Sequence, residues 1–101
     1  MTDKRSARRV PLVIRIEAQA GGSPRILLAQ NISAGGILLR SADPLAEGTT
    51  LQLKFILPGA DGEIRVAARV QHVTPGEFAG AQFLDLNPTD AEAIRRFVEA
   101  T

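Results

Sequence analysis

A cluster of basic residues near the N-terminus supplies the side chains best suited to bind an anion. Lys4, Arg5, Arg8 and Arg9 place four positive charges within six positions. A guanidinium presents a planar fork of donors that fits phosphate oxygens and, equally, the O6 and N7 acceptors of guanine. Arg5 and Arg9 therefore put two such forks on one segment. Charge alone is explained as well by a solvated, disordered start to the chain.

A second candidate is the turn Asn-Ile-Ser-Ala-Gly-Gly at residues 31–36. Asn31 and Ser33 stand two apart at a strand end, so in extended chain they would face the same side. Gly35 and Gly36 can adopt positive φ, and they let a ligand approach backbone N–H groups that donate to anions. An ordinary hairpin with a polar turn is the alternative that this pattern leaves open.

Residue types that would indicate catalysis are scarce. His72 is the only histidine, and no Asp or Ser pattern marks it as part of a triad. The chain has no cysteine, so a thiolate nucleophile and disulfides are excluded. The acidic residues lack the spacing of a metal site, and no glycine-rich nucleotide fingerprint opens a helix. We therefore expect a binding protein, not an enzyme, and no metal or cofactor.

Most of the chain is predicted to form strands. Hydrophobic residues alternate with polar ones, as in Leu51, Leu53 and Phe55 against Gln52 and Lys54, which is the period of a half-buried strand. Gly80 is expected to mark a bend or bulge. The fold class is all-β, and the pattern fits a small antiparallel barrel or sandwich. Six strands are expected, at residues 10–18, 25–32, 36–41, 50–57, 64–73 and 78–86.

One helix is expected to end the chain, over residues 89–100. Thr89 and Glu92 have the spacing of a capping box, with Thr89 as the N-cap. Ala91, Ile94, Phe97 and Val98 recur at helical spacing and form an apolar stripe. That stripe is expected to pack on the barrel, with a partner-binding role as the alternative.

Length and composition fit one small domain. The chain has 101 residues, of which 45% are hydrophobic and 23% are charged, and its net charge is +1. Residues 1–9 are expected to form a flexible basic arm and residues 10–101 a single domain. No signal-peptide pattern and no apolar run of about 20 residues is visible, so we expect a cytoplasmic protein without membrane insertion.

The two motifs occur together in one known family. Arg5-x-x-x-Arg9, followed by Asn31-x-Ser33-x-x-Gly36, resembles the PilZ domain family. The stretches "PLAEGTTLQLKF", "ARVQHV" and "AGAQFLDLNPTDAEAIRRFV" are similar to the later strands and closing helix of that family. The resemblance covers residues 4–101. It implies a six-stranded antiparallel β-barrel that binds the bacterial second messenger cyclic di-GMP.

The resemblance also implies a role for each motif residue. Arg5 and Arg9 would contact guanine Hoogsteen edges and phosphates. Asn31 and Ser33 would hold guanine and phosphate on the barrel surface, and Gly36 would keep the turn open. Asn31 offers one carbonyl where an aspartate could accept twice from guanine, so a somewhat weaker guanine contact is expected.

Several further residues are weaker candidates for ligand contact. Lys4 stands where family members with arginine tend to bind a stacked ligand pair, so the stoichiometry of one or two molecules stays open. Arg8 could reach a phosphate, Gly35 adjoins the motif glycine, and Arg40 could line the site. Some members carry an aromatic residue near the position of His72. The chain has no Trp or Tyr, so stacking on guanine is expected to fall to arginine.

The expected function is a cyclic di-GMP receptor that orders its arm on the ligand and signals to an unknown protein partner. One alternative is a PilZ-like protein-interaction module that does not bind the nucleotide. Another is a small barrel that binds single-stranded RNA, which would require surface aromatic residues for base stacking. Binding to DNA is not expected, and the oligomeric state is open.

Overall fold

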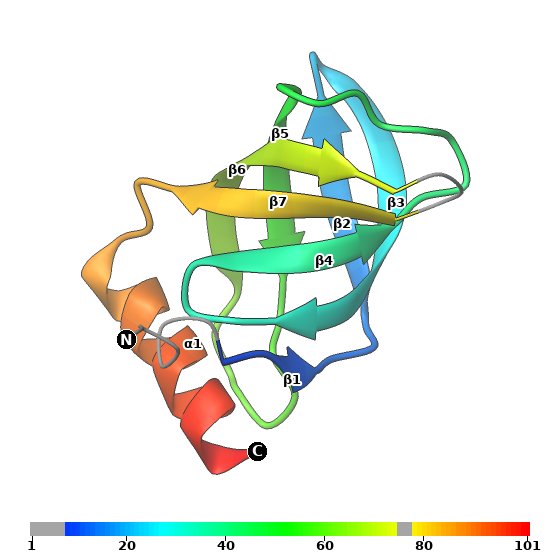
Figure 1. Ribbon diagram of the computed structural model, residues 1–101. Coiled ribbons are helices and arrows are strands. Elements are labelled where there is room, and N and C mark those ends of the chain that lie inside the picture. The colour runs from blue at the N-terminus through cyan, green and yellow to red at the C-terminus, as the bar shows by residue number, and fades with distance from the viewer. Residues whose placement is uncertain (1–7, 75–77) are drawn as a thin grey trace.

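The computed structural model describes residues 8–74 and 78–101, which form a closed antiparallel sheet followed by one helix (Figure 1). Within them the order across the sheet is β1-β3-β2-β5-β6-β7-β4, and β4 also pairs with β3, so the sheet closes on itself. Strands β2 to β7 make a six-stranded barrel, and β1 is a short addition on the end of β3. The predicted fold class is confirmed. The strands are β1 Val10–Pro11, β2 Arg15–Ala20, β3 Ser23–Ile32, β4 Gly36–Arg40, β5 Thr50–Phe55, β6 Ile64–Val73 and β7 Phe78–Leu84.

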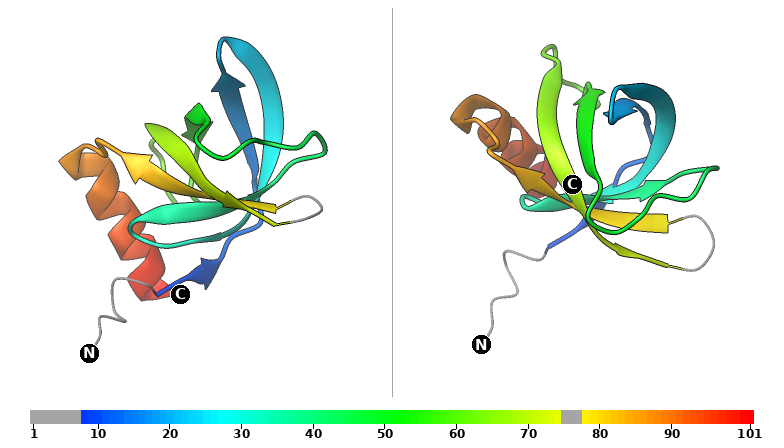
Figure 2. Two further views of the ribbon diagram at one scale, coloured as in Figure 1. Left: turned by 45° about the horizontal axis from the view of Figure 1, so that its top comes forward. Right: turned by 90° about the horizontal axis from the view of Figure 1, so that it is seen from above.

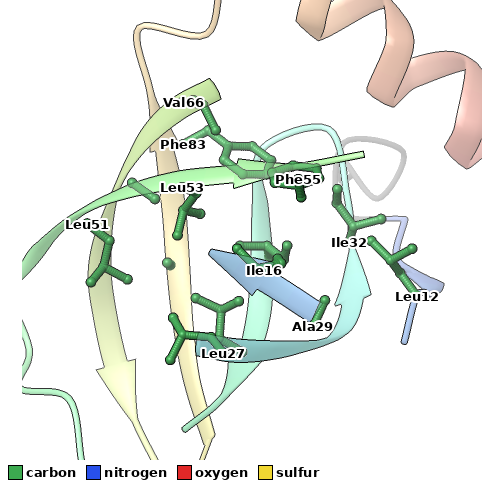
Figure 3. Close-up of a cluster of buried hydrophobic side chains, with 14 of the residues drawn as sticks. Leu12, Ile16, Leu27, Ala29, Ile32, Leu51, Leu53, Phe55, Val66 and Phe83 are labelled. Atoms are coloured by element: carbon green, nitrogen blue, oxygen red, sulfur yellow. The ribbon is translucent and has the colours of Figure 1, made fainter. Parts of the chain in front are cut away.

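Period-two alternation accounts for the core. In β5, Leu51, Leu53 and Phe55 are buried, whereas Gln52 is exposed. Figure 3 shows these side chains inside the barrel together with Ile16 of β2, the strand that pairs with β5. Each strand thus turns one face to a shared apolar interior and the other to solvent.

The predicted first strand, residues 10–18, is in fact two strands. β1 pairs with the end of β3, through Val10 opposite Ile32 and Pro11 opposite Asn31, whereas β2 starts at Arg15. Proline has no N–H to donate to a sheet ladder, and this interrupts regular pairing after β1. Leu12 and Ile16 are buried as expected, although the predicted strand is divided between them.

A bulge does occur near Gly80, but on the neighbouring strand. Pairing of β6 with β7 shifts between Val70 and His72, so that Val70 lies opposite Ala81 and His72 opposite Gly80. The extra residue, Gln71, belongs to β6. A bulge bends its strand and re-aims the side chains beside it.

Helix α1, Pro88–Ala100, has a different N-cap from the one predicted. Asn87 is the cap, since its Oδ1 accepts a hydrogen bond of 2.8 Å from the N–H of Asp90. Pro88 occupies the first turn, where its missing N–H costs nothing. The predicted capping box was wrong because Glu92 is engaged elsewhere, in ion pairs of 2.6 Å with Arg95 and 3.0 Å with Arg96.

The helix lies against the outside of the barrel and buries the predicted stripe. Ile94 and Val98 are buried, and Phe97 packs against the core. Figures 1 and 2 show α1 following β7 and running so that its C-terminal end lies close to β1. Packing of α1 on the barrel is therefore observed. Among the described residues, no helix is long and apolar enough to cross a membrane.

Candidate ligand-binding site

The turn between β3 and β4 is built around the side chain of Ser33. Its backbone N–H donates to the carbonyl oxygen of Gly36 at 2.9 Å. Its Oγ accepts from the N–H of Gly35 at 3.3 Å and lies 3.4 Å from the same Gly36 carbonyl, to which it donates. Ser33 is only 4% exposed. The hydroxyl therefore closes the turn and sets the path of the two glycines.

The two glycines serve different purposes, and neither adopts the positive φ that the sequence suggested. At Gly36 a Cβ would lie 2.5 Å from the carbonyl oxygen of Ala81 on β7, so a side chain does not fit there. At Gly35 a Cβ would meet nothing within 4 Å. Gly36 thus allows close strand packing, and Gly35 leaves space open above the turn.

The two sequence motifs meet through Arg9 and Asn31. Nη1 of Arg9 donates to Oδ1 of Asn31 at 2.8 Å, although 22 positions separate them. The pairing of β1 with the end of β3 explains this proximity, because Pro11 lies opposite Asn31. The C-terminal end of the basic segment, at Arg9, therefore lies beside the Ser33 turn.

A shallow cavity of about 300 Å³ opens at this place. Its volume lies at the lower end of the range for small-molecule sites. Donors and small residues dominate its lining, which suits a flat, polar or anionic ligand approaching the backbone. The lining residues are Arg9, Ser33, Gly35, Gly36, Gln71, His72, Gly80, Ala81 and Gln82.

His72 is a component of this cavity that sequence reasoning did not select. A Cβ on Gly80 would lie 2.5, 2.9 and 3.1 Å from three atoms of the His72 ring. Three such similar distances mean that the imidazole lies with its flat face over Gly80. His72 is exposed and lines the cavity. His72 lies opposite Gly80 on the neighbouring strand, and this pairing could in principle have indicated the contact. The bulge at Gln71 shifts the register by one residue, so the pairing could not be predicted from the sequence.

The remaining sequence candidates are not gathered into this cavity. Nη2 of Arg8 donates to the backbone carbonyl of Thr101 at 2.7 Å, so Arg8 points to the end of α1. Arg40 ends β4, four residues from Gly36 and hence about 13 Å along the strand. Arg40 is not among the residues that line this cavity. Lys4 and Arg5, like the greater part of the expected flexible arm, lie outside the described residues.

Comparison with known proteins agrees with this geometry. The sequence profile of the PilZ domain matches residues 3–100. The chain belongs to the PilZ domain family. PilZ domains form a family of cyclic di-GMP receptors and adaptor modules. A search of curated protein sequences finds no match.

Solved structures share the PilZ fold at low sequence identity. The inhibitor of motility MotI/DgrA from Bacillus subtilis superposes with a TM-score of 0.83 at 22% identity, over 99% of this chain and 51% of that one. This chain thus spans about half the length of MotI/DgrA. The PilZ domain of CeSA from a cellulose-synthesizing bacterium gives 0.66 at 20%, over 91% and 95% of the two chains. PlzA of Borreliella burgdorferi, solved in complex with c-di-GMP, gives 0.65 at 19%, over 97% and 38%.

Proposed function

We infer that this PilZ domain is a cyclic di-GMP receptor that holds the nucleotide in the cavity beside the Ser33 turn. The observation that carries the proposal is the hydrogen bond between Arg9, which lines that cavity, and Asn31. It joins both halves of the family motif at one place. Arg9 offers donors to phosphate or guanine, and Gly35 leaves the backbone accessible to a ligand.

The proposed binding steps follow from the charge and from the open space. The basic segment attracts the doubly charged ligand, and Arg5 and Arg9 then close over it while Asn31 and Ser33 hold its other side. Lys4 adds charge to the same segment. Binding orders the arm, residues 1–9, on the ligand, and this changes the surface that a partner protein meets. The domain thus acts as a cytoplasmic adaptor without enzymatic activity.

The energy of a few such contacts is sufficient. A good bidentate arginine–guanine contact contributes roughly 1–3 kcal/mol, and a charge-assisted hydrogen bond about 1.5–3 kcal/mol. Micromolar affinity corresponds to about 8 kcal/mol. Three or four contacts therefore reach micromolar affinity before the cost of ordering the arm is subtracted.

Isothermal titration of cyclic di-GMP into the purified protein tests the proposal, with GMP as a control that carries one guanine and one phosphate. We expect saturable heat for the dinucleotide, much weaker binding of GMP, and a stoichiometry of one or two from the same curve. Absence of heat at protein concentrations of tens of micromolar would leave the alternative, a PilZ-like interaction module that does not bind the nucleotide.

A further inference from the structure

The exposed hydrophobic side chains gather on one wall of the barrel. The described residues contain four large hydrophobic side chains that are clearly exposed, and all of them belong to β2, β3, β5 or the residues next to these strands. They are Val13 at 72%, Ile26 at 52%, Leu28 at 37% and Ile56 at 52% exposed. Single exposed apolar residues are ordinary, but a contiguous group marks an interaction surface.

Strand register shows that these side chains share the outer face. In β2, Arg15 and Glu17 point outward because Ile16 between them is buried, and the same alternation turns Val13 outward. Leu28 lies directly opposite Arg15 on β3. On the other side of β2, Glu17 pairs with Lys54, so continuing that register by two residues puts Ile56 opposite Arg15.

Arg15 therefore stands in the middle of the group. Leu28 lies across from it on β3, and Val13 lies two positions before it along the chain. Ile56 comes directly after the end of β5, where the extended register would place it near Arg15. Two other cations of this wall are paired, Lys54 with Glu17 at 3.1 Å and Arg65 with Glu63 at 2.9 Å. Nη1 of Arg25, on β3, is buried without a hydrogen-bond partner among the described residues. No ion pair or side-chain hydrogen bond within the described parts of the chain engages Arg15. Glu17, the acidic neighbour of Arg15 on the same face, is itself paired with Lys54. An exposed arginine beside apolar residues resembles the hot spots of protein interfaces.

The same wall carries a groove of about 530 Å³, which includes Ile26 of the exposed group. It shares no residue with the candidate nucleotide cavity. Helix α1 does not cover the four hydrophobic side chains, because each of them stays exposed in the folded chain. The groove is lined by residues of β2, β3, β5 and β6, among them Gln19, Pro24, Ile26, Gln52, Lys54 and Arg65.

We propose that this outer wall of β2, β3 and β5 docks a segment of a partner protein that carries apolar side chains beside an aspartate or glutamate. The apolar side chains cover Ile26, Leu28 and Ile56, and the carboxylate pairs with Arg15. A second copy of this chain is a poorer occupant, since this face carries more cations than anions and two copies would repel each other. The cations are Arg15, Arg25, Lys54 and Arg65, and the anions are Glu17 and Glu63. A flat lipid surface fills a groove less well than a protruding peptide segment does.

Selection from a random displayed-peptide library, with the immobilised ligand-free protein as bait, tests the proposal. Recovered peptides should be rich in Asp or Glu next to Leu, Ile or Phe. By fluorescence anisotropy, Arg15→Glu and Ile26→Asp should each weaken a recovered peptide at least tenfold. The matched control is Arg69→Glu, an equal charge change at an exposed position on β6 outside the apolar group. A peptide with its acidic residue changed to Lys should regain affinity for Arg15→Glu.

Basic peptides, peptides unaffected by Arg15→Glu, or equal losses in Arg15→Glu and Arg69→Glu would overturn the proposal. The proposal would also be overturned if the protein self-associated in sedimentation experiments and Ile26→Asp abolished this association. A third contrary result would be a protein that binds phosphatidylserine vesicles but selects no peptides. The nucleotide site is separate from this wall, so Arg15→Glu should titrate with cyclic di-GMP like the unmodified protein. A protein that selects acidic peptides but gives no heat with the nucleotide would contradict the proposed function alone.

Discussion

Nη1 of Arg9 donates a hydrogen bond of 2.8 Å to the amide oxygen of Asn31. This bond occupies the one side-chain carbonyl that Asn31 has for the N–H edge of a guanine. A ligand that uses both residues must therefore share this acceptor or displace the guanidinium from it. The exposed position of the bond makes such an exchange inexpensive, because water replaces the lost partner.

The first prediction concerns Arg9. Arg9→Ala should weaken cyclic di-GMP binding by about tenfold or more, in line with the roughly 1–3 kcal/mol of a bidentate contact. The melting temperature without ligand should stay nearly unchanged, because surface substitutions usually alter stability by less than about 0.5 kcal/mol. Titration calorimetry and thermal unfolding measure the two effects.

The control for Arg9→Ala is Arg8→Ala. It removes the same charge from the neighbouring position, but the Arg8 side chain reaches the Thr101 carbonyl instead of the cavity. A clearly smaller loss of affinity is expected. Equal losses in the two variants would mean that general positive charge, not the placement of Arg9, attracts the ligand.

Substitutions at the two turn glycines should affect stability and ligand binding differently. Gly36→Ala puts a Cβ 2.5 Å from the Ala81 carbonyl and must push β4 from β7, so stability should fall by about 1–3 kcal/mol. The Cβ of Gly35→Ala enters open space, so the free energy of unfolding should change by less than about 0.5 kcal/mol. The same methyl group should narrow the cavity and weaken ligand binding. Urea unfolding and calorimetry distinguish the effects. Equal stability of the two variants would refute the close packing assigned to Gly36.

His72 and Gly80 should act as a pair. If a guanine base stacks on the imidazole of His72, the variant His72→Ala should bind the nucleotide more weakly. Gly80→Ala should do the same, because its Cβ displaces the ring that lies over it. The double variant should then lose little more than either single one, since both remove the same platform. Additive losses in this double-mutant cycle would show that the ring and the glycine act independently.

A pH-dependent term in stability should come from Glu92. Hydrogen bonds from Arg95 and then Arg96 lower the pKa of its carboxyl below the ordinary value of 4.5. The stabilisation is therefore fully present above pH 4.5 and is lost as the pH falls through the lowered pKa. Glu92→Gln should be less stable than the unmodified protein at pH 7, and the difference should disappear in acid. A difference that persists unchanged in strong acid would assign the effect to packing instead.

Period-two patterns in the sequence were sufficient to predict the strands and their inward faces, because Leu51, Leu53 and Phe55 must share a face in any strand. They left a barrel and a sandwich equally open, and the resemblance to the PilZ family decided for the barrel. The N-cap of α1 could not be predicted in this way, because two neighbouring residues compete for that position. Asn87 and Thr89 are both good N-caps, and local sequence does not decide between them. The pairing of Glu92 with Arg95 and Arg96 removes the second half of a capping box.

The candidate site was predictable where it follows a motif and hidden where it depends on register. Arg9, Asn31 and Ser33 could be chosen from residue type and spacing. The proximity of His72 to Gly80 could not, because it depends on a bulge that shifts the pairing of β6 with β7. Arg40 lies at the far end of β4 from the turn, and its part in ligand binding stays a prediction.

The most direct test of the central claim is to map the bound nucleotide by ¹⁵N NMR titration with cyclic di-GMP. The account predicts that the largest amide shifts appear at Ser33, Gly35, Gly36 and Gly80 and at the side-chain amide of Asn31. Amides on the outer wall of β2, β3 and β5 should move little. Saturating shifts that fall on that wall while the Ser33 turn stays unchanged would contradict the account.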